Sequence, residues 1–154
     1  MSLTKFTTDA RRQLSAVDMM AEKYDAITEL IDVLDRSGQL QNRQVALEAV
    51  FTREKTRSTG IGSGIAIPHG KCRAVKQLVM AMGIAREPIE FDSVDNIGVS
   101  IVILLISPLE QTGPHIQALA KISKLMLDAA FRNALQQAAS AEAAYKLLSE
   151  RESE

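Results

Sequence analysis

Apolar side chains recur at intervals of three and four residues in the first third of the chain, at residues 21–40 and again at residues 41–57. This spacing gathers them on one face of a helix, so each segment is predicted to form one. The first helix is expected to stop at Ser37 and Gly38, and the second near the turn at residues 58–60. The repeating positions are Tyr24, Ile27, Leu30, Ile31 and Leu34 in the first helix and Val45, Ala46, Ala49 and Val50 in the second.

Two apolar runs follow in the middle of the chain, at residues 77–85 and 99–107. Both have the length of a strand, and the second, VSIVILLIS, is the most apolar stretch of the sequence. A strand without alternating polar positions is typical of one that is covered on both faces. Between the two runs, residues 86–98 carry the Pro, Asp, Asn and Gly of a loop, with a short extended piece expected at residues 88–91.

The last third of the chain returns to helical spacing after a loop at residues 107–113. Pro114 is a typical residue for a helix N-terminus, and a long apolar repeat follows it. Asp128 interrupts this repeat and is expected to divide it into two helices. Ser140 is the predicted N-cap of one more helix that closes the chain.

A few strands among helices, the longest of them buried, predict an α/β domain in which a single mixed β-sheet has helices on both faces. The chain has 154 residues, which is long enough for one domain with its own core. A single domain is therefore expected over residues 1–154.

The composition argues against several classes of protein. Apolar residues make up 46% and charged residues 24% of the chain, and 18 Lys and Arg against 19 Asp and Glu give a net charge of −1. Such a balance offers no electrostatic attraction for nucleic acid or anionic lipid, and neither is expected as a partner. The sequence shows no signal peptide and no transmembrane stretch, so no membrane insertion is expected. With Cys72 as its only cysteine, the chain is expected to be cytoplasmic and to use this residue for packing.

The sequence GIGSGIAIPHG, at residues 60–70, is the first candidate for chemistry. Its glycines allow backbone N–H groups to approach an anion, and Pro68 restricts the backbone before His69, at the end of a predicted strand. Neither standard nucleotide-binding loop matches, so ATP and NAD are not expected. A simpler interpretation also exists, a turn with a β-bulge and a histidine without chemistry. Cationic residues near His69 in the sequence are Arg53, Lys55, Arg57 and Lys71.

The second histidine strengthens the functional interpretation. His115 follows Pro114 at the predicted start of a helix, on the same stripe as Leu119 and Ile122, so it should face the body of the protein. The partial positive charge of a helix N-terminus disfavours a protonated imidazole and favours anions. Two histidines, basic residues and glycine amides at one sheet edge suit a transient phosphoryl group. No third ligand is spaced for zinc, so no metal is expected.

The motif REKTRSTGIGSGIAIPHGK, at residues 53–71, resembles the active-site signature of the mannitol/fructose-type EIIA domains of the bacterial phosphoenolpyruvate:sugar phosphotransferase system (PTS). The later PHIQALAKIS, at residues 114–123, resembles the second histidine motif of that family, with Ile116 and Ile122 replacing leucines. The resemblance covers about residues 17–149. It implies a mixed sheet between helical layers, in agreement with the pattern of apolar residues.

The resemblance also implies roles for individual residues. His69 would accept a phosphoryl group from phosphohistidine on the carrier protein HPr, His115 would help to position it, and Arg53 would neutralise its charge. The onward acceptor would be the cysteine of an EIIB domain, and no cofactor is implied. Further residues in the matching motif that could contribute to phosphoryl binding are Glu54, Thr59, Gly60, Gly62 and Gly64.

Two functions remain open at this point. The first is a phosphotransferase, a phosphocarrier in sugar uptake that passes phosphate from HPr to an EIIB. The second is a nitrogen-type regulatory EIIA, in which the phosphorylation state of His69 controls binding to protein partners. Both depend on the same chemistry at His69, and the sequence names no sugar.

Overall fold

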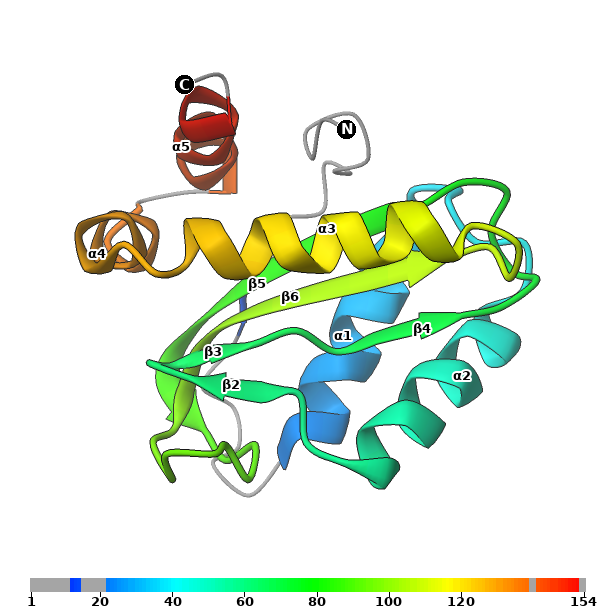
Figure 1. Cartoon of the computed structure of the whole chain (residues 1–154), viewed down its shortest axis with the longest axis horizontal. Coiled ribbons are helices and arrows are strands. Elements are labelled where there is room, and N and C mark those ends of the chain that lie inside the picture. The colour runs from blue at the N-terminus through cyan, green and yellow to red at the C-terminus, as the bar shows by residue number, and fades with distance from the viewer. Residues whose placement is uncertain (1–11, 15–21, 139–140, 153–154) are drawn as a thin grey trace.

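A mixed β-sheet of six strands forms the centre of the computed structural model, which describes residues 12–14, 22–138 and 141–152 (Figure 1). The strand order is β1-β5-β6-β3-β2, and β4 also pairs with β6. Strands β5 and β6 are antiparallel, whereas β3 and β4 run parallel to β6 and β1 runs parallel to β5. The strands are β1 (Arg12–Leu14), β2 (Gly60–Gly62), β3 (Ile65–Ala66), β4 (His69–Lys71), β5 (Val79–Ile89) and β6 (Val99–Ser107).

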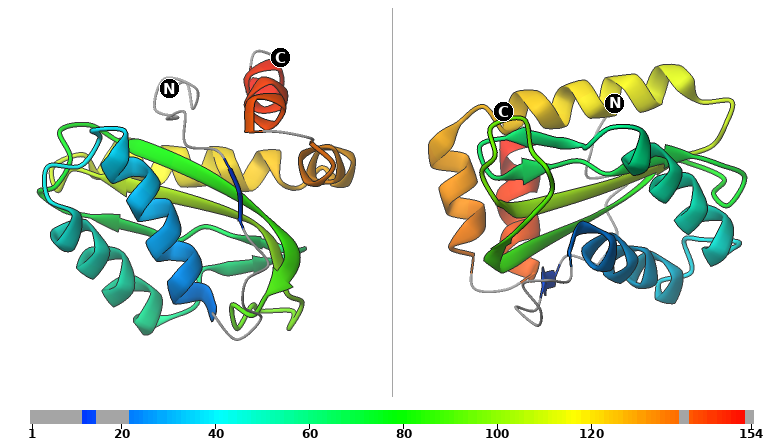
Figure 2. Two further views of the ribbon diagram at one scale, coloured as in Figure 1. Left: turned by 180° about the vertical axis from the view of Figure 1, so that it is seen from behind. Right: turned by 90° about the horizontal axis from the view of Figure 1, so that it is seen from below.

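Helices cover both faces of this sheet, as the sequence predicted. In Figure 1 and in the right-hand view of Figure 2, α1 and α2 lie on one side and α3 lies on the other. The described helices are α1 (Glu22–Arg36), α2 (Arg43–Thr56), α3 (Thr112–Leu125), α4 (Ala129–Gln136) and α5 (Ala141–Glu152). None of the helices in this part of the chain combines the length and the apolar character needed to cross a membrane.

Each face of the sheet has its own apolar core. The first core packs α1 and α2 against alternate residues of β5 and β6, such as Ala81 and Leu104. The second packs α3, α4 and α5 against the residues between them, such as Met80 and Leu105. Strand β6 therefore lies in the middle of both cores, which explains why almost all of it is apolar and buried.

The predicted ends of two elements, β5 and α3, differ from the observed ones. Strand β6 matches its predicted range, whereas β5 begins at Val79 and continues to Ile89, into the extended piece predicted near residues 88–91. Helix α3 starts at Thr112, two residues before Pro114. Proline is tolerated in this first turn because the N–H groups there have no intrahelical acceptor, so the missing N–H of proline costs no hydrogen bond.

The predicted division of the long C-terminal repeat at Asp128 is confirmed. Helix α3 ends at Leu125, and the Asp128 carboxylate accepts hydrogen bonds from the backbone N–H groups of Ala130 and Phe131 as the N-cap of α4. The carboxylate also pairs with Arg151 of α5, with 2.6 Å between nitrogen and oxygen. Ser140, predicted to cap the last helix, lies outside the described residues.

Candidate functional site

The glycine-rich segment forms a tight β2–β3 hairpin followed by a separate short strand. Residues 62–64 all have positive φ, and Gly62 at +100° lies in a region that L side chains rarely adopt. The pairing register shifts between Gly60 and Gly62, so the β-bulge of the simpler sequence interpretation is present. The predicted strand ends earlier than expected, because β3 stops at Ala66 and His69 begins β4 instead.

His69 is half-buried, and its ring is oriented by the backbone that precedes it. Strand β4 pairs in parallel with β6, which places His69 beside Leu105 on the face covered by α3. The Nδ1 atom of His69 lies 2.8 Å from the carbonyl oxygen of Ile67. Because a carbonyl can only accept a hydrogen bond, Nδ1 carries the hydrogen, and Nε2 of the neutral ring has a free lone pair.

The surroundings of His69 favour its neutral form. Burial lowers the pKa of His69 and the charge of Arg53 lowers it further, whereas the hydrogen bond to Ile67 and the charge of Glu54 act in the opposite direction. The result is a net decrease in this pKa, so His69 is uncharged at neutral pH. A neutral imidazole with a free Nε2 lone pair is a nucleophile.

His115 lies beside His69 in the structure although the two are 46 positions apart in the sequence. The two ring centroids are 5.4 Å apart with an interplanar angle of 57°. His115 is buried on α3, as its position on the apolar stripe predicted, and its Nδ1 lies 2.7 Å from the hydroxyl oxygen of Ser107. Burial, assisted by His69 and Lys71, lowers the pKa of His115 to about 4, so this ring is also neutral.

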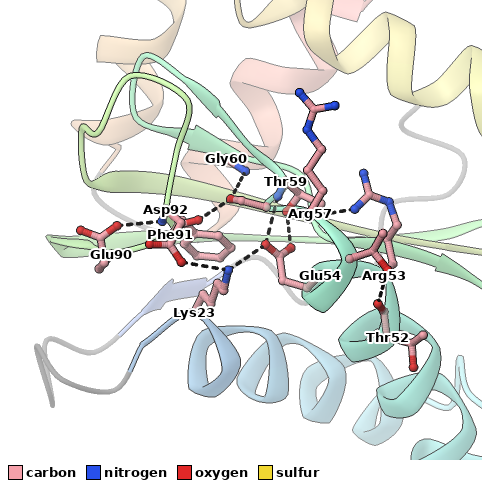
Figure 3. Close-up of polar contacts among 12 residues, drawn as sticks. Lys23, Thr52, Arg53, Glu54, Arg57, Thr59, Gly60, Glu90, Phe91 and Asp92 are labelled. Carbon is pink, nitrogen blue, oxygen red and sulfur yellow. Dashed lines mark hydrogen bonds and ion pairs between the residues drawn. The ribbon is translucent and has the colours of Figure 1, made fainter.

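Two cationic side chains approach the histidine pair from different elements. Lys71 projects from β4, and its Nζ donates a hydrogen bond of 3.0 Å to the hydroxyl of Thr112 at the start of α3. Arg53 comes from the last turn of α2, and its Nη1 donates to the carbonyl oxygen of Arg57 at 2.7 Å (Figure 3). The Arg57 side chain itself is exposed.

Glu54 and Thr59 bind each other. The Glu54 carboxylate, which is 1% exposed, accepts hydrogen bonds from the backbone N–H of Thr59 at 3.0 Å and from its hydroxyl at 2.5 Å (Figure 3). Lys23 of α1 completes the charge balance with an ion pair of 3.3 Å to Glu54 and a second one of 3.5 Å to Asp92. These contacts connect the end of α2 to the hairpin that leads to His69, whereas phosphoryl binding by Glu54 and Thr59 stays a prediction.

The glycine amides differ in what they contact. The N–H of Gly60 donates to the hydroxyl of Ser58 at 3.0 Å, and its carbonyl accepts from Val94. The carbonyl of Gly64 accepts from Ser100 and Ile101 of β6. For Gly60, Gly62 and Gly64, phosphoryl binding stays a prediction, whereas their part in shaping the hairpin is visible.

Sequence reasoning missed Ser107 and the Ile67 carbonyl. The one signal for Ser107 is a polar residue that closes the most apolar run, a position that predicts the start of a loop. Cys72, in contrast, is buried as expected, and burial raises the pKa of its thiol. Among the described residues, no three His, Cys, Asp or Glu side chains gather in a way that could hold a metal ion.

Comparison with known proteins gives consistent matches. The family model described as "Phosphoenolpyruvate-dependent sugar phosphotransferase system, EIIA 2" matches residues 12–151. The fructose-specific EIIABC component of the PTS of Bacillus subtilis (strain 168) is 33% identical over 129 residues, which are 84% of this chain and 20% of that protein. The nitrogen regulatory protein of Escherichia coli (strain K12) is 39% identical over 112 residues, 71% of this chain and 68% of that protein.

A solved structure agrees with these matches. The crystal structure of the nitrogen regulatory protein IIA-Ntr from Neisseria meningitidis superposes with a TM-score of 0.77 at 28% identity, covering 94% of this chain and 97% of that one. The chain thus spans about two thirds of the Escherichia coli protein but only a fifth of the Bacillus protein.

Proposed function

Because the chain belongs to the EIIA 2 family of the phosphoenolpyruvate-dependent sugar phosphotransferase system, we propose that it is a phosphocarrier that takes a phosphoryl group onto Nε2 of His69. The donor is phospho-HPr, the acceptor is the cysteine of an EIIB, and the transfer takes place in the cytoplasm. Residues 1–154 act as a single EIIA domain in this proposal, with the motif-bearing part at about residues 17–149.

The hydrogen bond between Nδ1 of His69 and the Ile67 carbonyl is the observation that carries this proposal. It leaves the lone pair at Nε2, which attacks the phosphorus of the phosphohistidine on HPr. The new N–P bond forms while the N–P bond of the donor breaks, and the donor imidazole keeps the electron pair. The phosphorylated ring is cationic, which strengthens the Nδ1–H donation to Ile67.

The residues around His69 supply what a loose phosphoryl-transfer transition state requires, namely positioning and charge stabilisation. Arg53 supplies a planar cation that matches phosphoryl oxygens, and Lys71 adds a second positive charge close to His115. His115, neutral and 5.4 Å away between ring centroids, positions the group without adding a charge of its own. Onward transfer reverses the chemistry, because a cysteine thiolate attacks the phosphorus and returns the lone pair to Nε2.

The second candidate function is regulation. The match of 39% identity to the Escherichia coli nitrogen regulatory protein and the 28% identity to the Neisseria IIA-Ntr structure favour it. A phosphoryl group on His69 adds negative charge at a half-buried position on the surface, which changes the contacts open to a protein partner. The two functions share the first transfer step and differ in what happens to the phosphoryl group afterwards.

The test is the intact mass of the protein after incubation with phosphoenolpyruvate, Enzyme I and HPr. We expect the wild type to gain one acid-labile phosphoryl group and the His69→Ala variant to gain none, with an unchanged fold by circular dichroism. His115→Ala should still be labelled, but transfer onward should be slower. Label that persists in His69→Ala would overturn the proposal, and complete loss of label in His115→Ala would show that the two histidines have the opposite roles.

The labelled protein then separates the two candidate functions. Mixed with a fructose-type EIIB, a sugar-uptake phosphocarrier should lose its label within seconds, and the EIIB cysteine should gain it. A regulatory protein should keep the label and bind partner proteins differently in its two states.

A further inference from the structure

Ser107 occupies an unusual place for a polar residue. It is the last residue of β6, fully buried after eight consecutive residues of which seven are apolar, and its neighbour across the parallel pairing is Lys71 of β4. Its backbone carbonyl accepts a hydrogen bond from the N–H of Cys72 at 2.9 Å. Its hydroxyl contacts Nδ1 of His115 at 2.7 Å, and this is the only partner that the described residues give it.

The direction of that hydrogen bond decides which nitrogen of His115 carries the hydrogen. If the hydroxyl donates, Nδ1 is the acceptor and Nε2 of the neutral ring carries the hydrogen. If Nδ1–H donates, Nε2 is left with a lone pair. In that second arrangement the Ser107 hydroxyl would accept only, and its own hydrogen would be buried without an acceptor among the described residues.

Two considerations favour donation by Ser107. A buried hydroxyl hydrogen without an acceptor is costly, and donation to Nδ1 removes that cost. The lone pair of a second imidazole would also repel the oxygens of a phosphoryl group on His69, whereas an N–H attracts them. The low pKa of His115 excludes the doubly protonated ring at neutral pH, in which Ser107 would have to accept.

We propose that Ser107 is a positioning residue for phosphoryl transfer, whose hydroxyl donates to Nδ1 of His115 and so fixes the tautomer in which Nε2 of that ring is a hydrogen-bond donor. The proposal rests on the proposed function of His69 and deepens it. The two histidines then differ by the partner of Nδ1 alone. A carbonyl at Ile67 gives His69 a lone pair on Nε2, and a hydroxyl at Ser107 gives His115 an N–H on Nε2.

The first test measures the tautomer directly. Nitrogen-15 NMR of the imidazole side chains distinguishes a protonated ring nitrogen from a bare one at pH 7. In the unphosphorylated wild type we expect a bare Nδ1 and a protonated Nε2 in His115, with the reverse in His69. Ser107→Ala should shift His115 toward the other tautomer, and Ser107→Thr, which keeps the hydroxyl on a residue suited to strands, should restore the wild-type pattern. A wild-type His115 with hydrogen on Nδ1 would overturn the proposal.

The second test asks whether Ser107 acts through His115. We expect Ser107→Ala to slow phosphoryl transfer roughly five- to tenfold, the effect typical of one lost hydrogen bond, while Ser107→Thr stays close to the wild type. In the His115→Ala background, Ser107→Ala should cause no further decrease. Ser100→Ala, which removes a half-buried hydroxyl at the opposite end of β6, is the matched control and should leave the rate unchanged.

The failures of the two proposals are distinguishable. A wild type that takes no label would refute the proposed function, and the role of Ser107 in transfer with it. A labelled wild type whose rate is unaffected by Ser107→Ala would refute the role of Ser107 alone. An equal decrease in the wild-type and His115→Ala backgrounds would show that Ser107 acts on the fold and not through His115.

Discussion

At the scale of single residues, Arg53 supplies a positive charge near His69, while a backbone carbonyl sets the orientation of its side chain. Its side chain is held by the carbonyl oxygen of Arg57, 2.7 Å from Nη1, and its charge is near enough to His69 to lower the pKa of that ring. The partner is a backbone atom, so the Arg57 side chain is not needed to orient Arg53. This separation makes Arg57 a matched control for Arg53.

We expect Arg53→Ala to slow phosphorylation of His69 by roughly 10²- to 10³-fold, the loss typical of removing one donor that stabilises transition-state charge. Arg53→Lys should recover only part of the rate, because an ammonium keeps the charge but not the planar fork. Arg57→Ala preserves the carbonyl that holds Arg53 and should stay within a few-fold of the wild type. The measurement is the rate of label uptake from phospho-HPr, and an equal loss in Arg53→Ala and Arg57→Ala would contradict this assignment.

The sequence predicted some of these residues and missed others for a physical reason. His69, His115 and Arg53 can be predicted as site residues because residue type, glycine spacing and a resemblance to known motifs are all visible in the local sequence. Ser107 and the Ile67 carbonyl act through contacts that depend on how β4, β6 and α3 pack. Every residue has a backbone carbonyl, so the sequence does not show which one will accept a hydrogen bond from His69. A serine at the end of an apolar run looks the same as any polar residue that begins a loop.

At the scale of elements, β4, like β1, is one of the short strands that the sequence did not predict. It has three residues, too few for a recognisable apolar pattern, and it exists because β6 pairs with it and α2 packs against it. Gly70 allows this close packing, since a Cβ at this position would lie 3.2 Å from backbone atoms of Ala49 and Val50 in α2. The position of His69, its neighbour, therefore depends on the distance between β4 and α2.

We expect Gly70→Ala to push β4 away from α2, to lower the free energy of unfolding by about 1–3 kcal/mol and to slow phosphorylation of His69. Gly113→Ala is the matched control, because it also lies near a catalytic candidate, in the first turn of α3, but its Cβ would meet no atom within 4 Å. This control should be neutral or slightly stabilising, since alanine favours the helix. Urea unfolding and the label assay measure both effects, and equal stability of the two variants would contradict the argument.

At the scale of the whole molecule, the sheet brings together segments that lie far apart in the sequence. The layered α/β arrangement was predictable, because the apolar periodicity of each segment shows which face must be buried. The strand order was not predictable, because the parallel pairing of β3 and β4 with β6 joins residues more than 30 positions apart. No local sequence pattern indicates such a pairing. The two apolar cores then meet at β6, and the histidine pair lies at the end of that strand.

The histidine pair also links the stability of the whole fold to pH. In the unfolded chain each imidazole titrates near its ordinary pKa of about 6.5, whereas burial, together with the neighbouring His69 and Lys71 side chains, lowers the pKa of His115 to about 4 in the folded state. Between these two values the unfolded chain binds the extra proton, so the free energy of unfolding must fall as the pH is lowered. The lowered pKa of His69 acts in the same direction.

We expect the shift at His115 alone to lower the free energy of unfolding by about 2 kcal/mol between pH 7 and pH 5. Asp95 and Asp128, whose pKa values are lowered, take up protons only below this pH range. The measurement is urea unfolding at both pH values. His115→Gln keeps a side chain of similar size that does not titrate, so its stability should depend less on pH by about that amount. An unchanged pH dependence in His115→Gln would show that His115 is not held neutral by the fold, and would remove the physical basis for treating it as a neutral donor to the phosphoryl group.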